Sequence, residues 1–398
     1  MAEHNNITIG FSDNKCCGCG SCINICPTNA LYMGGSKDGF IVPCIDQEKC
    51  IGCERCISAC PYNHLETEDT ALEVYAAVNI SENILVNSSS GGVFAELAKA
   101  VLGEGGLVFG CTLDDDFKAK HISVENEEEL HSIMRSKYIQ SETGDSFKKV
   151  KNAIKSGRKV LFSGTPCMVA GLKSFLGKES NNELLITVDV VCHGVSSQSL
   201  FSDYLTNLNK QLGTPVTKYT FRAKEKASNG MQWKVAYETS KKEHIRNWPE
   251  DSYNYYYMMG YTHRESCYEC PFASPHRYSD ITLCDYWSWN EFALPFNIED
   301  SVSGVVVNSQ NGISLFKKVK HQFRIAQSDF NSLSKHNGGL VHHGERPKGR
   351  DMIVSIWKNE GYESLDTHFK KNNKRQILKY RIMRMLPYKL ICLVHKIL

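Results

Sequence analysis

Hydrophobic and polar positions alternate in a regular way through the middle of the chain. Between residues 72 and 212, short apolar runs take turns with segments whose apolar side chains recur every three or four positions. The first pattern predicts buried strands and the second amphipathic helices. The expected strands are 72–78, 106–111, 159–163 and 184–192, and the expected helices are 91–102, 127–135, 146–156 and 199–212. Such alternation is typical of an α/β domain.

The first sixty residues follow a pattern set by cysteines instead. Two copies of one spacing occur, and each ends in Cys-Pro. They read Cys16-x2-Cys19-x2-Cys22-x3-Cys26-Pro27 and Cys50-x2-Cys53-x2-Cys56-x3-Cys60-Pro61. This is the run of bacterial two-cluster ferredoxins, in which the fourth cysteine of each run binds the other cluster. We therefore assign one [4Fe-4S] cluster to Cys16, Cys19, Cys22 and Cys60, and the second to Cys50, Cys53, Cys56 and Cys26.

Structural zinc is the alternative for this segment. Zinc sites usually present two pairs of ligands rather than three closely spaced cysteines plus a Cys-Pro, so iron–sulfur clusters are favoured. These clusters carry single electrons, which predicts an electron-transfer module. Cys17 falls outside the spacing, and we interpret it as a thiol that binds neither cluster.

Length allows the module to be followed by a larger domain, since the chain has 398 residues. We expect an α+β protein, with a ferredoxin-like dicluster domain followed by a larger α/β domain that binds a flavin and a cluster. The expected boundaries are 1–66 for the ferredoxin-type domain, 72–165 and 166–345 for two parts of the larger domain, and 346–398 for a basic helical tail.

Charge and composition limit the kinds of partner and the cellular compartment that we expect. The net charge of +2 does not indicate nucleic-acid binding. The 17 cysteines, without an apolar leader before the first motif or an apolar stretch of bilayer-spanning length, favour metal sites in the cytoplasm over disulfides. Residues 370–396 mix basic and apolar side chains, which fits a helix docked on the body or a peripheral contact with an anionic membrane face.

Small and polar residues gather where the expected strands end, which is where α/β proteins bind ligands. A serine- and glycine-rich turn at residues 88–92 opens a helix and offers N–H groups to an anion such as a diphosphate, although such turns also serve only as helix caps. Lys137, beside Tyr138, is placed to pair a phosphate or to lie under a cofactor ring; a surface loop is the alternative.

These motifs resemble the coenzyme F420 hydrogenase/dehydrogenase beta-subunit family over roughly residues 75–345. The resemblance rests on Ser90-Gly-Gly-Val-Phe94, Ser136-Lys-Tyr138, Gly164-Thr-Pro-Cys-Met-Val-Ala-Gly-Leu172, Cys192-His-Gly-Val-Ser196, Phe221-Arg-Ala-Lys224, Cys267-Tyr-Glu-Cys-Pro271 and Asp285-Tyr-Trp287. It implies an iron–sulfur flavoprotein that binds FAD and exchanges hydride or electrons with a second substrate. In the archaeal members of the family that substrate is a deazaflavin.

The resemblance also implies roles for particular residues. A third [4Fe-4S] cluster is expected at Cys167, Cys192, Cys267 and Cys270, with Cys284 as an alternative ligand; two buried thiols plus a zinc or redox pair are the other interpretation. His193 is a candidate donor to flavin or substrate, or a structural histidine. FAD is expected to lie against Ser89, Ser90, Gly91, Gly92, Ser136, Lys137, Tyr138, Gly164, Thr165 and Pro166.

The function expected from these features is that of an FAD-dependent iron–sulfur oxidoreductase with an unidentified substrate. The alternatives are a deazaflavin oxidoreductase and a non-catalytic electron-transfer subunit of a larger complex. The expected partner is an electron-exchanging protein or a small redox substrate. No Gly-x-Gly-x-x-Gly run occurs, which disfavours a nicotinamide.

Overall fold

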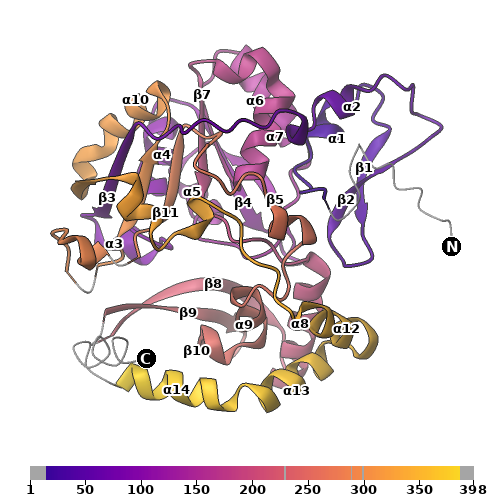
Figure 1. Cartoon of the computed structure of the whole chain (residues 1–398), viewed down its shortest axis with the longest axis vertical. Helices are drawn as coiled ribbons and strands as arrows, with labels where there is room; N and C mark the ends of the chain where they lie inside the picture. The colour runs from indigo at the N-terminus through magenta and orange to yellow at the C-terminus, as the bar shows by residue number, and fades with distance from the viewer. Residues whose placement is uncertain (1–14, 228–229, 288, 298–299, 386–398) are drawn as a thin grey trace.

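Three β-sheets and the helices around them make up the chain in the computed structural model, which describes residues 15–227, 230–287, 289–297 and 300–385. A two-stranded module at the N-terminus lies against one side of a large mixed sheet, and a three-stranded sheet lies opposite one edge of that large sheet (Figure 1). The fold is therefore a ferredoxin-like dicluster region followed by a larger α/β domain, as expected.

The N-terminal module has little regular structure because cysteine loops take up most of its length. Strand β1 (Leu31–Gly35) pairs antiparallel with β2 (Ile41–Ile45). The helical segments are α1 (Ser21–Ile25), α2 (Arg55–Ser58) and the 3-10 turn η1 (Pro61–Asn63). Gly18 and Gly20 have φ values of 71° and 84°, and this left-handed conformation, which glycine adopts without strain, turns the first cysteine loop sharply.

The large sheet has the strand order β13-β3-β12-β11-β7-β6-β4-β5. Its strands are β3 (Glu73–Asn79), β4 (Leu107–Leu113), β5 (Ala119–Val124), β6 (Val160–Gly164), β7 (Leu185–Val190), β11 (Ile281–Asp285), β12 (Ser303–Val307) and β13 (Phe323–Ser328). The four central strands, β11, β7, β6 and β4, run parallel, and the remaining pairs are antiparallel. The parallel strands read as continuous apolar runs because both faces of this sheet are covered.

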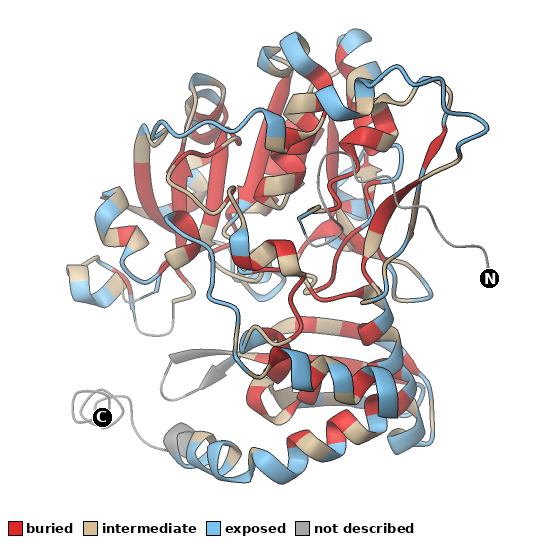
Figure 2. Ribbon diagram, turned by 45° about the vertical axis from the view of Figure 1, so that its right-hand side comes forward, coloured by how far each residue is buried: buried red, intermediate tan, exposed pale blue. Residues whose placement is uncertain are grey.

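Helices from both halves of the chain cover the large sheet, whose strands are mostly buried (Figure 2). One face carries α4 (Val93–Gly103), α5 (Glu127–Ile133) and α10 (Gln310–Val319). The other carries α6 (Ser146–Lys155) and α7 (Pro166–Leu176). Short helices α3 (Glu82–Val86) and α11 (Phe330–Ser334) lie at the periphery. Leu97 packs on the first face and Leu172 on the second, and both are fully buried.

A smaller unit is built on the three-stranded sheet β10-β9-β8. Its elements are α8 (Gln198–Leu212), β8 (Val216–Ala227), β9 (Gly230–Thr239), β10 (Glu243–Asn247), α9 (Ser252–Met258), α12 (Arg350–Glu360), α13 (Tyr362–Asn372) and α14 (Lys374–Met385). Aromatic rings fill its core: the Phe201 ring lies 5.0 Å from that of Phe221 and 4.9 Å from that of Tyr253.

Helix α14 docks on this smaller unit. Arg381 Nε donates to Glu250 at 2.7 Å, and the Tyr255 hydroxyl donates to Gln376 at 3.0 Å. Leu378 and Ile382 face outward. The remainder of the expected tail, residues 386–398, lies outside the described residues, so a membrane contact through it stays a prediction. No helix within the described ranges has both the length and the apolar character needed to cross a bilayer.

The parallel strands bring three loops to one edge of the large sheet. Strands β6, β7 and β11 end at Gly164, Val190 and Asp285, and these ends lie side by side because the strands are neighbours and run in the same direction. Arg222 of β8 donates to Asp285 at 2.7 Å, so this edge faces the three-stranded sheet. Open α/β sheets bind ligands at the carboxyl ends of their strands.

Candidate redox site

The N-terminal cysteines of the two runs lie close to one another. Burial and the neighbouring thiols of Cys16 and Cys60 raise the pKa of Cys22 above its usual range. Burial also raises the pKa of Cys56, whose thiol faces Cys26 and Cys53. The fourth cysteine of each run thus lies beside the other run, although metal ligation itself stays a prediction.

Backbone amides already point at two of these sulfur atoms. Gly18 N–H donates to Cys16 Sγ at 3.3 Å, and Ala30 N–H donates to Cys26 Sγ at 3.3 Å. Amide hydrogen bonds to sulfur are one of the means by which a protein sets the potential of an iron–sulfur cluster. No three His, Cys, Asp or Glu side chains in the described ranges converge as they would on a single ion. Cysteines that bind different corners of a four-iron cube are spaced more widely than that.

A second set of cysteines gathers at the carboxyl edge of the large sheet. Cys167 is the second residue of α7, Cys192 follows β7, and Cys267 and Cys270 belong to a 3-10 turn, η4 (Glu265–Glu269), and its C-cap. Burial, followed by the Cys267, Cys167 and Cys270 thiols, raises the pKa of Cys192 well above its usual value. Burial and its neighbours likewise raise the pKa of Cys267 to about 12 and of Cys270 to about 11. The four thiols therefore face one another.

Two further cysteines, Cys17 and Cys284, have surroundings that differ from those expected from the sequence. The Cys17 thiol lies between those of Cys167 and Cys19, at the boundary between the second set and the N-terminal module. The spacing of the ferredoxin runs gave no signal for this position. Cys284 contacts the carbonyl of Gly304, and the charged groups around it are Asp285, Arg277 and Asp189 rather than thiols. It lies apart from the set of four.

A buried ion pair holds the loop that carries Cys267 and Cys270. Arg277 Nη2 lies 2.7 Å from Asp189 Oδ2, and both side chains are 0 % exposed. Arg277 Nη1 also donates to the carbonyl of Phe272, two residues after Cys270, at 3.2 Å. Because Asp189 lies on β7 shortly before Cys192, this pair joins the two loops that supply thiols.

The residues expected to bind a flavin come together only in part. Ser136 donates through both its N–H and its hydroxyl to Ser89 Oγ, at 2.9 and 3.1 Å, so two of the three segments are in contact. Gly91 N–H donates to Ser303 Oγ at 2.7 Å. A Cβ atom on Gly91 would lie 2.2 Å from the carbonyl oxygen of Ala77, so this glycine is required by the packing of the protein itself.

The Lys137 ammonium group is bound to backbone carbonyls of the preceding helix. Its Nζ donates to the carbonyls of Ser132 and Met134, at 3.2 and 2.6 Å, and so caps the C-terminus of α5. Burial lowers its pKa to about 8. The third expected segment contributes Thr165, whose hydroxyl lies 3.2 Å from Cys167 Sγ. Gly164 packs beside Phe162 and Met168, and Pro166 is the first residue of α7.

Tyr138 lies at the centre of the site. Its ring stacks on that of Tyr257 with a centroid distance of 4.5 Å and an interplanar angle of 15°. The Tyr257 hydroxyl donates to the carbonyl of Gly194 at 3.1 Å, and burial, then the Cys192 thiol, raise its pKa. This tyrosine pair therefore reaches from the second cysteine set to the loops at Ser89 and Ser136.

Charged side chains line the same region. Arg222 pairs with Asp285 and lies over the rings of Trp233 and Trp287, at 5.6 and 5.9 Å. Its Nε atom is buried and has no acceptor within the described part of the chain. Lys224 Nζ donates to the carbonyls of Leu85 and Ser90, and burial followed by the Arg222 charge lowers its pKa to about 7.

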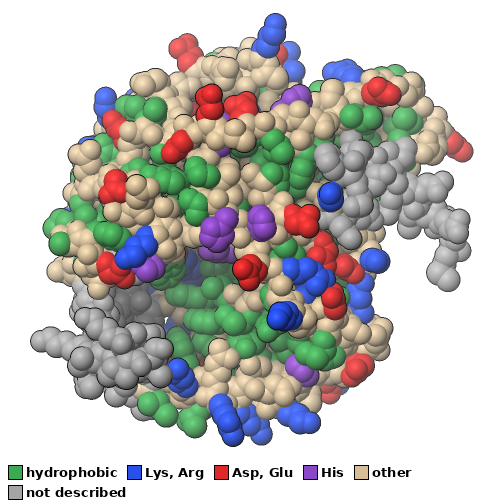
Figure 3. Space-filling view, in the orientation of Figure 1, with side chains coloured by type: hydrophobic (Ala, Val, Ile, Leu, Met, Phe, Trp, Pro, Cys, Tyr) green, Lys and Arg blue, Asp and Glu red, His purple; other side chains and the backbone are tan. Residues whose placement is uncertain are grey.

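His193 lies exposed beside these groups. Neighbouring groups that crowd its ring and displace water lower its pKa, and the nearby Asp285 carboxylate opposes that effect. A hollow separates the large sheet from the three-stranded unit, and hydrophobic and basic side chains are visible within it (Figure 3). His193 is thus accessible at this edge, and its role as a donor to flavin or substrate stays a prediction.

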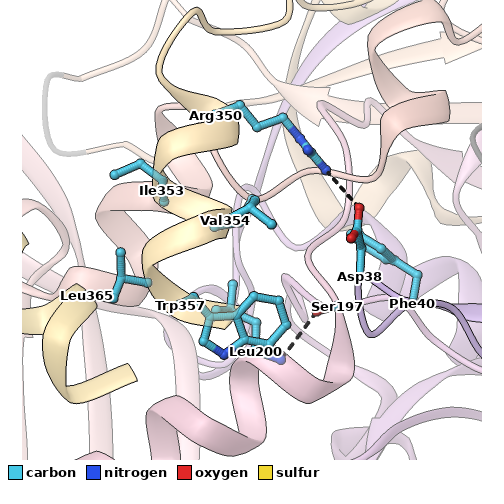
Figure 4. Close-up of a pocket in the computed structure, with 10 residues that line it drawn as sticks. Asp38, Phe40, Ser197, Leu200, Arg350, Ile353, Val354, Trp357 and Leu365 are labelled. Carbon is cyan, nitrogen blue, oxygen red and sulfur yellow. Dashed lines mark hydrogen bonds and ion pairs between the residues drawn. The ribbon is translucent and has the colours of Figure 1, made fainter. Parts of the chain in front are cut away.

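The N-terminal module also meets the smaller unit around a small pocket (Figure 4). Asp38, in the loop between β1 and β2, lies 2.5 Å from Lys358 Nζ and 4.0 Å from Arg350 Nη2. The lining residues are Asp38, Phe40, Ser197, Leu200, Thr262, Arg350, Ile353, Val354, Trp357 and Leu365. The pocket marks a docking contact between the N-terminal module and the smaller unit.

Comparison with known proteins matches two families to parts of the chain. Residues 15–64 match the 4Fe-4S dicluster domain, and residues 157–332 match the C-terminal domain of the coenzyme F420 hydrogenase/dehydrogenase beta subunit. No curated protein matches the chain. Among solved structures, a chain of the F420-reducing [NiFe] hydrogenase complex from Methanosarcina barkeri, studied after xenon derivatization, aligns with a TM-score of 0.46 and 16% identity, covering 76% of this chain and 94% of that one.

The fold and the two family matches define an iron–sulfur protein of the electron-transfer oxidoreductase class. More particularly, residues 157–332 match the model of the C-terminal domain of the coenzyme F420 hydrogenase/dehydrogenase beta subunit and residues 15–64 match that of a 4Fe-4S dicluster domain, in agreement with the resemblance drawn from the motifs.

Proposed function

We propose that this chain is an FAD-dependent iron–sulfur oxidoreductase. Electrons pass between two ferredoxin-type clusters, a third [4Fe-4S] cluster bound by Cys167, Cys192, Cys267 and Cys270, and FAD. The flavin exchanges two electrons with a substrate that remains to be identified. Bound FAD supplies the conversion between single electrons and an electron pair, because a flavin accepts either.

The observation that carries the proposal is the continuity of buried groups between the two cysteine sets and the hollow. Cys19 packs against α7, where a Cβ on Gly171 would lie 2.8 Å from its Sγ. Helix α7 begins next to Cys167. From Cys192 the contact continues to Tyr257 and Tyr138, which stack at 4.5 Å. Short packed steps of this kind suit single-electron transfer.

The four thiols suit an iron–sulfur cluster by their chemistry. As free thiols they are half-buried, and the Cys167, Cys267 and Cys270 thiols raise the pKa of Cys192. Metal binding requires thiolates, and the metal charge offsets their mutual repulsion. Cys167 lies in the first turn of α7, whose N-terminal dipole also favours negative charge.

The carboxyl edge of the large sheet suits a flavin or its substrate because Arg222 has a donor there without an acceptor among the described residues. The buried Arg222 Nε has no acceptor among the described residues, and a polar ligand atom there would satisfy it. Tyr138 provides an aromatic surface, and Ser89 and Ser136 provide hydroxyl groups at its side. His193 is exposed at the same edge and is placed to donate to a ligand.

Cofactor analysis of anaerobically purified protein tests the proposal. We expect about twelve irons per chain, four for each cluster, and one FAD. A content near eight irons with zinc present would contradict the third cluster. Iron without flavin, even after incubation with FAD, would instead favour the role of a non-catalytic electron-transfer subunit. Substrate screening of the reduced protein should include a deazaflavin, because turnover with it would establish that alternative.

A pair of variants on helix α9 tests the path through the tyrosines. Tyr257→Leu should slow flavin reduction by the reduced clusters, since it removes the ring between Cys192 and Tyr138. Tyr255→Leu is the matched control, because the Tyr255 side chain lies on the same helix but faces α14. Equal rates in the two variants, measured by rapid mixing, would rule out this path.

A further inference from the structure

Arg264 is a buried cation at the boundary between the two cysteine sets. It is 2 % exposed and is the largest of the fully buried side chains. Its Nε donates to the carbonyl of Cys16 at 2.5 Å, and its Nη1 donates to the carbonyl of Ile41 at 2.9 Å. Both acceptors belong to the N-terminal module, so the guanidinium reaches across the boundary.

The backbone of Arg264 belongs to the larger domain, on the side of the second cysteine set. Its N–H donates to the carbonyl of Val195 at 3.0 Å, and its own carbonyl accepts from the N–H of Cys267 at 2.9 Å. The residue therefore starts the turn that carries Cys267 and is joined to the loop that carries Cys192. One side chain links a peptide that flanks the first ferredoxin cluster to the loops of the second cysteine set.

One donor of Arg264 has no acceptor among the described residues, and its guanidinium charge lies over the ring of Phe40, 5.5 Å from the centroid. Its Nη2 atom is buried with no acceptor among the described residues, and no carboxylate there forms an ion pair with it. An isolated buried cation is strongly destabilising unless it is paired. Thiol-bearing residues adjoin it on both sides, since the Cys267 N–H donates to its carbonyl at 2.9 Å and the Cys16 carbonyl accepts from its Nε at 2.5 Å.

We infer that Arg264 is a positioning residue whose Nη2 donor and positive charge face the third cluster. The inference rests on the third cluster of the proposed function. A cube bound by four thiolates is an anion, and reduction adds a further negative charge to it. A fixed cation with a hydrogen bond to its sulfur atoms stabilises the reduced form more than the oxidised form. Arg264 thus raises the reduction potential of this cluster and draws electrons inward from the ferredoxin module.

Potentiometric titration monitored by electron paramagnetic resonance tests this inference. Arg264→Gln should retain iron and shift one cluster to a more negative potential, by a tenfold or larger change in its reduction equilibrium, which is about 59 mV for one electron. Arg264→Lys, which keeps the charge, should restore most of the shift. Gln140→Leu is the matched control, since Gln140 bonds Ile41 on both its carbonyl and its N–H, at 2.8 and 2.7 Å, without bringing a charge.

The outcomes separate this inference from the proposed function. Wild-type iron near eight would contradict the third cluster itself, whatever the variants do. With twelve irons in the wild type, unchanged potentials in Arg264→Gln would overturn the role of Arg264 alone. Equal potential shifts or equal iron loss in Arg264→Gln, Arg264→Lys and Gln140→Leu would also overturn it, because they would assign the residue to docking only.

Discussion

Replacing Arg277 with methionine should destabilise the protein and release the third cluster. The change leaves the Asp189 carboxylate buried at 0 % exposure without its partner at 2.7 Å. Breaking a buried pair from one side costs about 3–5 kcal/mol, a large part of the 5–15 kcal/mol that typically holds a folded domain. Phe272 also loses the donor to its carbonyl, which loosens the loop after Cys270. We expect iron to fall from about twelve to about eight per chain, with the ferredoxin clusters retained.

A double-mutant cycle gives the sharpest form of this test. Asp189→Leu combined with Arg277→Met replaces both charges by apolar groups, and such replacements are often close to neutral. The double variant should therefore be more stable than the sum of the single variants predicts, by about 2 kcal/mol or more. Urea unfolding of the four proteins, with iron analysis of each, measures both effects. Additive losses, or an Arg277→Met protein within about 1 kcal/mol of wild type and with full iron, would refute the reasoning.

Three further predictions concern other parts of the chain. Cys26→Ser should damage the cluster of the second run rather than that of its own run, and spectroscopy showing the reverse would exclude crossed ligation. Gly171→Ala should cost about 1–3 kcal/mol in urea unfolding, because its Cβ would lie 2.8 Å from Cys19 Sγ, whereas Gly103→Ala, with open space around it, should be nearly neutral. Burial lowers the pKa of His121 from 6.5 to about 4, so stability present above pH 6.5 should fall by about 3 kcal/mol as the pH drops towards 4. His121→Gln should lose that pH dependence in parallel unfolding experiments.

The core of the large sheet was predictable because its strands are short, continuous apolar runs. Expected strands 72–78 and 159–163 correspond to β3 (Glu73–Asn79) and β6 (Val160–Gly164), and expected helix 146–156 corresponds to α6 (Ser146–Lys155). The three-stranded sheet was not anticipated. Strand β8 alternates apolar and polar side chains from Tyr219 to Lys224, a pattern typical of a half-buried strand, but the expected elements ended at residue 212.

Only those site residues that are close together in the sequence could be predicted from their spacing. The crossed ferredoxin runs follow from intervals within forty-five residues, whereas the four later cysteines depended on resemblance to a family. Arg264 gave no signal because its acceptor on Cys16 lies 248 positions away in the chain. Cys17 was set aside on spacing, and its place between Cys19 and Cys167 arises only when the module docks on α7. The domain boundaries and flavin contacts stay predictions.

The unequal exposure of the cysteines should determine which cluster is damaged first when the protein meets air. Cys50 and Cys53 are exposed, whereas Cys19 and Cys22 are buried. Oxidants attack accessible thiolates first, and the early products of that attack are reversible. Brief contact with oxygen should therefore strip the outermost cluster before the inner ones. The chain would then lose electron exchange with an outside partner, whereas the proposed buried clusters and flavin would remain intact. Loss of the exposed cluster would thereby protect the buried ones from oxidation.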